Sequence, residues 1–331
     1  MIAEFEQFGA IVDRASTFVL TTHVNPDGDG LGCELAIAAY LRAKGKRVSI
    51  LNHSATPPNY LFLDPANDIQ RYDPSRHESL IAEADVIVVL DSNHPDRLVS
   101  MQQAVLSSRA TKVCIDHHLD TAPFADLYII DEPATATGEI VFKLIAYLDG
   151  TALDKSVCAT LYAAIMTDTG GFRYPKTDSE VHRIVAQLID HGADPVEIYN
   201  QIFDQGSPNR LQLLGKVLAG LTLAHDGKLA YISVTREMLS QTSTTEIDTD
   251  SFIPYTLGIQ GVQIGLMFTE LAGGVKISFR SKGEIWINQL AKQFSGNGHK
   301  NAAGGRVMNS GINEVIPQVL QQAKTFLREE L

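Results

Sequence analysis

Short runs of aliphatic and β-branched residues alternate with amphipathic stretches along the first half of the chain. The pattern predicts strands at 17–22, 47–52, 84–91 and 112–116 and helices at 30–44, 138–149, 154–167 and 178–191. The run Val86–Leu90 is aliphatic throughout, which is typical of a strand covered on both faces. Such strands alternating with helices predict an α/β fold with a doubly wound, mostly parallel sheet. An α+β domain with the same elements in another order is the alternative.

The second half of the chain predicts a smaller α/β domain with a mixed sheet. Its strands are expected at 221–224, 228–234, 262–269 and 275–280, and its helices at 285–294 and 312–329. A connecting helix is expected at 207–218. We therefore expect a catalytic domain at 1–191, a linker with a connector helix at 192–214 and a second domain at 215–331, with an active-site cleft between the domains.

The composition is that of an ordinary globular protein. The chain has 331 residues, of which 44% are hydrophobic and 20% are charged. Its longest aliphatic run is far shorter than the roughly 20 residues that span a bilayer, and its N-terminus is acidic where a signal peptide would be basic. Cys33, Cys114 and Cys158 are widely spaced, which indicates reduced core thiols. We expect a cytoplasmic protein with no membrane partner.

Charge is distributed unevenly along the chain, whose net charge is −12. The first 190 residues hold 15 basic and 26 acidic side chains, and the rest hold 12 and 13. Segment 271–306 has only one acidic residue, Glu284, and six cations, which we call the basic strip: Lys276, Arg280, Lys282, Lys292, Lys300 and Arg306. Because charge acts locally, this strip indicates an anionic ligand despite the acidic total.

Imidazole and carboxylate groups follow the predicted strands. The candidates are His23, Asp27 and Asp29 after the first strand, Asp91 after the third, Asp116, His117 and His118 after the fourth, and Asp168 at the end of a helix. Taken singly, these residues also fit turns and helix caps. Parallel sheets, however, place ligand sites at the carboxyl ends of their strands. Oxygen and imidazole ligands without thiolate suit manganese, magnesium or cobalt, and two such ions favour displacement at phosphorus.

These residues closely resemble, in order, the four motifs of the DHH phosphoesterase superfamily. The second half resembles the DHH-associated C-terminal domain through the glycine-rich segment 295–305, SGNGHKNAAGG. Together with 279–283, FRSKG, it resembles the nanoRNase and pAp phosphatase group. The resemblance covers nearly the whole chain. One departure is Asn297, which stands where the family usually has glycine; asparagine tolerates left-handed backbone angles, so we expect the turn to survive.

The resemblance implies a role for each site residue. One manganese ion would be bound by His23, Asp27 and Asp91, and a second by Asp29, Asp91, His117 and Asp168. Asp116 would orient His117, and His118 would face the scissile phosphate. In the second domain, substrate would be bound by Arg280, Ser281, Lys282, Gly296, Gly298, His299 and Lys300, through side chains and exposed backbone N–H groups. Lys276, Lys292 and Arg306 are expected to be solvated surface charges.

The implied function is that of a manganese-dependent exoribonuclease and 3′(2′),5′-bisphosphate nucleotidase. It would degrade short RNA oligonucleotides to 5′-mononucleotides and 3′-phosphoadenosine 5′-phosphate (pAp) to AMP, as a homodimer. Magnesium or cobalt could replace manganese. Long nucleic acid is not expected as a partner, because there is no long basic track or aromatic platform, and Trp286 lies in a helical pattern that fits a core position. Alternatives are a cyclic-dinucleotide or linear-dinucleotide phosphodiesterase and a non-catalytic nucleotide sensor.

Overall fold

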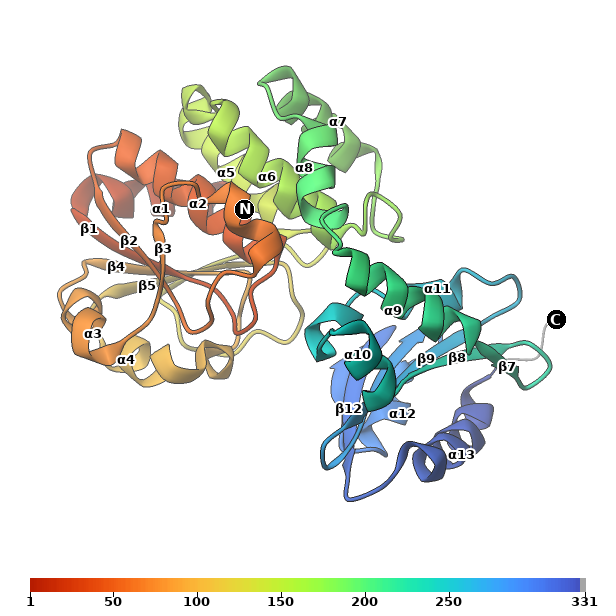
Figure 1. Ribbon diagram of the computed structural model, residues 1–331. Coiled ribbons are helices and arrows are strands. Elements are labelled where there is room, and N and C mark those ends of the chain that lie inside the picture. Colours follow the sequence, from red (N-terminus) through yellow and green to blue (C-terminus); the bar gives the residue numbers. More distant parts are fainter. Residues whose placement is uncertain (328–331) are drawn as a thin grey trace. The chain divides into compact units, whose positions relative to one another are not determined.

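A computed structural model describes residues 1–327. The chain divides into two compact units, Met1–Gln205 and Gly206–Leu331, and each is described by itself (Figure 1). The segment 192–214, expected to be a linker, holds helix α8 (Pro195–Phe203) at the end of the first unit and most of helix α9 (Pro208–Ala219) at the start of the second.

The first unit is built on a six-stranded parallel sheet with the order β3-β2-β1-β4-β5-β6. Its strands are β1 (Thr17–Thr21), β2 (Arg47–Asn52), β3 (Ile69–Arg71), β4 (Val86–Leu90), β5 (Thr111–Asp116) and β6 (Leu127–Ile130). The predicted doubly wound sheet is thereby confirmed. Strand order reverses between β1 and β4, and a crevice for ligands opens at such a point in this type of sheet.

Helices cover both faces of this sheet (Figure 1). Phe18, Leu20 and Val88 pack on one side with α1 (Ile2–Arg14), α2 (Gly28–Ala43), α5 (Thr137–Asp149), α6 (Lys155–Asp168) and α7 (Ser179–Asp190). Val19 and Ile87 pack on the other with α3 (Pro74–Ala82) and α4 (Gln102–Ser107). Alternate residues of one strand enter opposite cores, which is why the strands are apolar throughout. Short 3₁₀ turns lie at Pro58–Leu63, Pro95–Met101 and Gly150–Ala152.

The second unit has a mixed six-stranded sheet with the order β11-β12-β10-β9-β8-β7, as predicted. Its strands are β7 (Thr222–Ala224), β8 (Leu229–Val234), β9 (Ile264–Leu271), β10 (Gly274–Ser281), β11 (Asn297–His299) and β12 (Ala302–Met308). β8 and β9 run parallel, and the other neighbours are antiparallel. The helices are α9, α10 (Arg236–Thr242), α11 (Pro254–Leu257), α12 (Ile287–Lys292) and α13 (Ile312–Ala323). Two 3₁₀ turns lie at Glu246–Thr249 and Lys324–Phe326.

The glycine-rich segment 295–305, expected to be a loop, forms a hairpin of β11 and β12. Gly298 has a φ of +148°, and a Cβ there would lie 2.5 Å from the carbonyl oxygen of Ala302. Only glycine allows such close backbone pairing. Asn297 is part of β11, and the left-handed residue of the segment is Ser295. The turn thus survives with Asn297 in place of glycine, and it does so without a left-handed backbone at Asn297, whose side chain accepts a hydrogen bond from Gly298 N at 2.8 Å.

Two helices are shorter than the pattern predicted. The helix expected at 285–294 is α12, Ile287–Lys292, and the one expected at 312–329 ends at Ala323 before a 3₁₀ turn. The three cysteines are buried and free, as expected. Among residues 1–327, no helix is both long and apolar enough to cross a membrane.

Candidate active site

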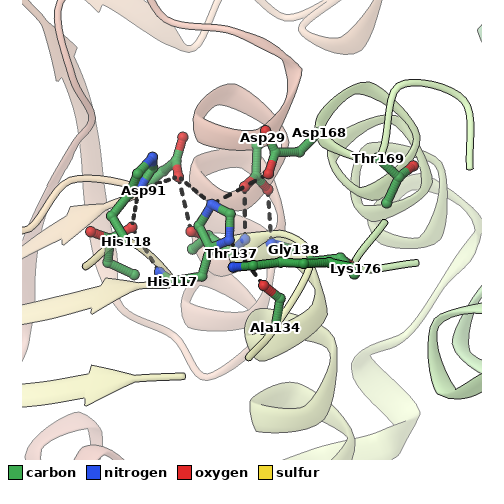
Figure 2. A network of polar contacts seen from close by, with 12 residues as sticks. Asp29, Asp91, His117, His118, Ala134, Thr137, Gly138, Asp168, Thr169 and Lys176 are labelled. Atoms are coloured by element: carbon green, nitrogen blue, oxygen red, sulfur yellow. Dashed lines mark hydrogen bonds and ion pairs between the residues drawn. The ribbon is translucent and has the colours of Figure 1, made fainter. Parts of the chain in front are cut away.

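The candidate active site lies where β1, β4 and β5 end, at the point of strand reversal (Figure 2). His23 follows β1, Asp91 follows β4, and Asp116 ends β5. All three side chains are buried, and Asp91 is only 2% exposed. Asp91 also has a φ of +56°, a region that non-glycine residues seldom occupy and that tends to be found at functional sites. Asp91 thus combines burial with an unusual backbone conformation, as functional residues often do.

The segment around Asp27, whose residues fit a turn or a helix cap, is the start of a helix. α2 begins at Gly28, and Asp27 caps it by accepting hydrogen bonds from the backbone N–H of Asp29 and Gly30 at 3.0 and 3.3 Å. A capping aspartate satisfies helix donors that would otherwise lack partners. Asp29, in the first turn, is fully buried, and its two oxygens accept hydrogen bonds from Thr137 N and Gly138 N at the start of α5.

Glycines let α2 pack against α6 at very short range. A Cβ on Gly32 would lie 2.4 Å from the carbonyl oxygen of Thr160, and one on Gly28 would lie 2.6 Å from the hydroxyl of Thr167. The absence of side chains at these positions brings the end of α6 to the start of α2. Asp168, the last residue of α6, therefore reaches Asp29.

The six predicted metal ligands are brought together in two groups. His23, Asp27 and Asp91 form one group, Asp29, His117 and Asp168 form the other, and the potential ligand atoms within each group lie within 4.8 Å of one another. Asp91 faces both: its Oδ2 lies 3.2 Å from Nε2 of His23, and its Oδ1 lies 3.8 Å from Nε2 of His117. Nε2 of His117 is also 3.3 Å from Oδ2 of Asp168. These groups could hold metal ions.

The electrostatics of the site favour a cation. Burial and the nearby carboxylates of Asp91 and Asp168 raise the pKa of Asp29 well above its usual range. Burial and Asp91 likewise raise the pKa of Asp168 to about 7. Burial alone would lower the pKa of His23, but the nearby carboxylates of Asp27 and Asp91 raise it to about 10. Crowded carboxylates that attract protons this strongly would be stabilised by divalent cations instead, so the donor set fits metal.

Asp116 orients His118, which corrects the prediction that it orients His117. Oδ1 of Asp116 lies 2.7 Å from Nδ1 of His118 and accepts the backbone N–H of His117 at 2.8 Å. The ring of His117 is held instead by the carbonyl oxygen of Ala134, 3.2 Å from its Nδ1. Burial works to lower the pKa of His118, but the Asp116 hydrogen bond and the charge of Asp91 outweigh it, so the net shift is upward.

Sequence reasoning missed Thr137 and Lys176. The hydroxyl of Thr137 donates to Oδ1 of Asp91 at 3.0 Å. Lys176 lies beside the site (Figure 2), donates to the carbonyl oxygen of Glu132 at 2.8 Å, and its charge acts to lower the pKa of Asp168. Thr137 lies far along the chain from the ends of the predicted strands, and a threonine before a helix is a common capping residue. The sequence pattern therefore did not indicate that Thr137 belongs to the site.

The predicted substrate-binding residues lie at one end of the second unit's sheet. Arg280 pairs in register with Ala302, and its Nη1 donates to the carbonyl oxygen of Phe279. Lys282 is exposed, and Lys300 forms an ion pair with Glu284 at 2.7 Å. Ser281 is buried and its hydroxyl donates to Ile285 O, so this side chain holds the loop and is not offered to a ligand. Gly296 and Gly298 lie in the hairpin, and the side chain of His299 is outside the described residues.

The basic strip is partly neutralised, which its sequence did not indicate. Glu246, distant in the chain, forms an ion pair with Lys276 at 2.8 Å and lies 3.8 Å from Arg306. Lys276 and Arg306 are thus charges of a surface network, as expected for surface positions.

Comparison with known proteins agrees with this geometry. Residues 17–167 match the DHH family, N-terminal domain, and residues 226–329 match the DHHA1 domain. The chain is 30% identical over 312 residues to the bifunctional oligoribonuclease and PAP phosphatase NrnA of Thermus thermophilus, covering 94% of this chain and 89% of the relative. It is 26% identical over 317 residues to the protein of that name from Bacillus subtilis, covering 95% of each.

Solved structures extend the comparison. An exopolyphosphatase-related protein from Bacteroides fragilis superposes with a TM-score of 0.95 at 33% identity, over 99% of this chain and 98% of that one. The exonuclease RecJ bound to manganese superposes with a TM-score of 0.53 at 13% identity, over 98% of this chain and 95% of that one. The second likeness concerns the fold alone.

Proposed function

The chain belongs to the DHH family, and we propose that it hydrolyses short oligoribonucleotides to 5′-mononucleotides and pAp to AMP. The observation that carries the proposal is the position of Asp91, whose two oxygens face His23 and His117 in two separate groups of potential ligands. A carboxylate so placed can bridge two ions. The relatives named above as oligoribonuclease and PAP phosphatase match along nearly their whole length, which supports the choice of substrate.

Two divalent ions, with manganese as our choice, would be held by the two groups. The first ion would be bound by His23, Asp27 and Asp91, and the second by Asp29, Asp91, His117 and Asp168. When bound, such a pair supplies a nucleophile at neutral pH and stabilises the entering and leaving oxygens of an in-line displacement at phosphorus. Thr137 fixes the rotation of the Asp91 carboxylate through its hydroxyl, and the N–H groups of α5 fix that of Asp29.

Both proposed reactions break the same kind of bond, which lets one site perform both. In RNA cleavage to 5′-mononucleotides and in removal of the 3′-phosphate of pAp, the bond between phosphorus and a ribose 3′-oxygen breaks. The departing oxygen requires a proton. In this proposal His118 supplies it from Nε2; its Nδ1 lies 2.7 Å from Oδ1 of Asp116, a contact that helps to keep the ring protonated.

Arg280 and Lys282 in the second unit would bind a phosphate of the substrate. A guanidinium binds phosphate in a two-pronged manner, and a lysine adds a point charge. These residues and their neighbour Lys300 make a short cationic site and not a track along the surface, so substrates with few phosphates are favoured. The protein as a whole has a net charge of −12, so its acidic surface outside this site would repel long polyanions.

A product assay tests the proposal. The chain with manganese is incubated with pAp, a diribonucleotide, a pentaribonucleotide, cyclic di-AMP and pyrophosphate, and the products are separated by chromatography. We expect AMP from pAp and 5′-mononucleotides from the oligoribonucleotides. The Asp91→Asn variant, checked for an unchanged circular dichroism spectrum, should lose both reactions together. Turnover of pyrophosphate alone, or of the cyclic dinucleotide alone, would contradict the proposal.

A further inference from the structure

Trp286 is a large aromatic side chain that the second unit holds at its surface. It is 52% exposed, whereas its neighbours Ile285 and Ile287 are buried at 5% and 0%. The two isoleucines anchor the chain on either side, so the indole ring between them faces solvent. The prediction that Trp286 fits a core position is therefore wrong, because the side chain lies at the surface. A single exposed apolar residue is ordinary, and its meaning depends on what surrounds it.

The segment that carries Trp286 is fixed to the glycine-rich hairpin. Asn301 donates from Nδ2 to Gly283 O at 3.0 Å, to Ile285 O at 3.3 Å and to the hydroxyl of Ser281 at 3.0 Å. The backbone N–H of Ile287 donates to Lys300 O at 2.7 Å. These bonds fix the backbone on both sides of Trp286 before any ligand arrives, which lowers the entropy lost on binding.

A cation lies beside the ring. Nζ of Lys300 is 5.6 Å from the centroid of the Trp286 ring, within the range of a cation–π contact, and 2.7 Å from Oε1 of Glu284. Glu284 is exposed, and surface ion pairs of this kind are weak, so Lys300 can exchange Glu284 for a phosphate oxygen. Arg280 and Lys282 belong to the same end of the sheet, since Ser281 N donates to Asn301 O.

We propose that Trp286 is a stacking platform for a nucleobase of the substrate, with Lys300 beside it to bind a phosphate of the same nucleotide. An indole ring stacks on any base, because every base has a π face. The platform therefore gives affinity without sequence preference, and it distinguishes a nucleotide from a sugar phosphate or inorganic phosphate. The inference rests on the proposed function for its substrate class and extends it to a residue that neither the motifs nor the basic strip contained.

The chain offers a direct test because Trp286 is its only tryptophan. Its fluorescence is measured while the metal-free protein is titrated with AMP or with ribose 5-phosphate, and binding of each is followed in parallel by calorimetry. We expect AMP to quench the emission and ribose 5-phosphate to leave it nearly unchanged at equal occupancy. Binding of AMP without a change in emission, or an absence of AMP binding, would overturn the proposal.

Kinetics supply the second measurement. Trp286→Ala should raise KM for a diribonucleotide about tenfold with little change in kcat, and Trp286→Phe should restore most of the loss. Met308→Ala is the matched control, because Met308 is also exposed, at 58%, and pairs with Gly274 at the opposite end of β12. The KM of this variant for the diribonucleotide should equal that of the wild type. An unchanged KM in Trp286→Ala would refute the platform while leaving the proposed function intact. If the wild-type protein hydrolysed none of the substrates, the proposed function would be refuted. The AMP titration would still show whether Trp286 stacks on a base.

Discussion

The hydroxyl of Thr137 donates a 3.0 Å hydrogen bond to Oδ1 of Asp91, joining residues 46 positions apart in the sequence. This bond fixes the carboxylate that we propose to bridge two ions. Removing the hydroxyl leaves Asp91 free to rotate at the centre of the site. Thr137→Val should therefore weaken metal binding or activity about 10- to 100-fold, the usual range for partners of metal ligands.

Thr137→Ser is the matched control, because it retains the hydroxyl. We expect it to bind manganese nearly as well as the wild type in calorimetric titrations. Equal affinities for the wild type and Thr137→Val would show that the hydrogen bond does not position Asp91.

The Asp116–His118 pair predicts a change in the pH dependence of activity. Burial acts to lower the pKa of His118, and the hydrogen bond to Asp116 is the largest influence that raises it. In Asp116→Asn that pKa should fall, so the ring loses its proton at a lower pH. The basic limb of the kcat profile for pAp should then move to lower pH, with a reduced maximum. A profile that only decreases in height would assign Asp116 to structure and not to the proton of His118.

Close packing of α2 on α6 predicts a difference between two glycine substitutions. Gly32→Ala places a methyl group 2.4 Å from the carbonyl oxygen of Thr160, and such overpacking costs ~1–3 kcal/mol of stability. It should also weaken manganese binding, since Asp168 is carried on α6. Gly215→Ala, in the middle of α9, meets nothing within 4 Å and should stabilise the second unit by ~0.5–1 kcal/mol. Denaturant unfolding measures both values, and equal effects would contradict this account of the packing.

Glu34 predicts how stability depends on pH. Its carboxyl group is fully buried behind the site and accepts a hydrogen bond from Nδ2 of Asn52 at 2.8 Å, and burial raises its pKa to about 8. The folded protein therefore keeps a proton that the unfolded chain loses above its ordinary pKa of about 4.5. Because the native state binds more protons, the free energy of unfolding should fall between about pH 4.5 and 8, by about 1.4 kcal/mol per pH unit from this group.

Glu34→Gln removes that proton and isolates its effect. The variant should lose this part of the slope when unfolding in urea is measured between pH 5 and 8. A slope equal to that of the wild type would show that Glu34 is ionised in the folded protein.

The sequence predicted the parts of the fold that strong patterns encode. The pattern predicts β2 at its observed bounds and β4 to within two residues, because an aliphatic run between polar residues has few alternatives. β3 and β6 were missed; both are short, and an edge strand buried on one side leaves a weak pattern. β12 was not predicted because it contains glycines, which have low strand propensity. They are needed here because the backbones of neighbouring strands lie very close together.

The candidate site was predictable as a set of residues and less so as a geometry. The ligand-type side chains follow strand ends, and parallel topology brings such ends together. Which ring Asp116 contacts depends on a side-chain rotation after β5, and the sequence holds no signal for it. The exposure of Trp286 depends on the hydrogen bonds by which Asn301 of the hairpin fixes the segment that carries the ring. These bonds join positions 15 or more residues apart, so the local pattern does not predict them.

The central claim is that the two groups of residues on either side of Asp91 would hold two divalent ions and that hydrolysis requires both. The most direct test measures the initial rate of diribonucleotide cleavage while metal-stripped protein is titrated with manganese and bound manganese is determined by equilibrium dialysis. We predict two bound ions per chain, with activity that rises as the second ion binds. Full activity at one bound ion per chain, or activity that persists in excess chelator, would contradict the account.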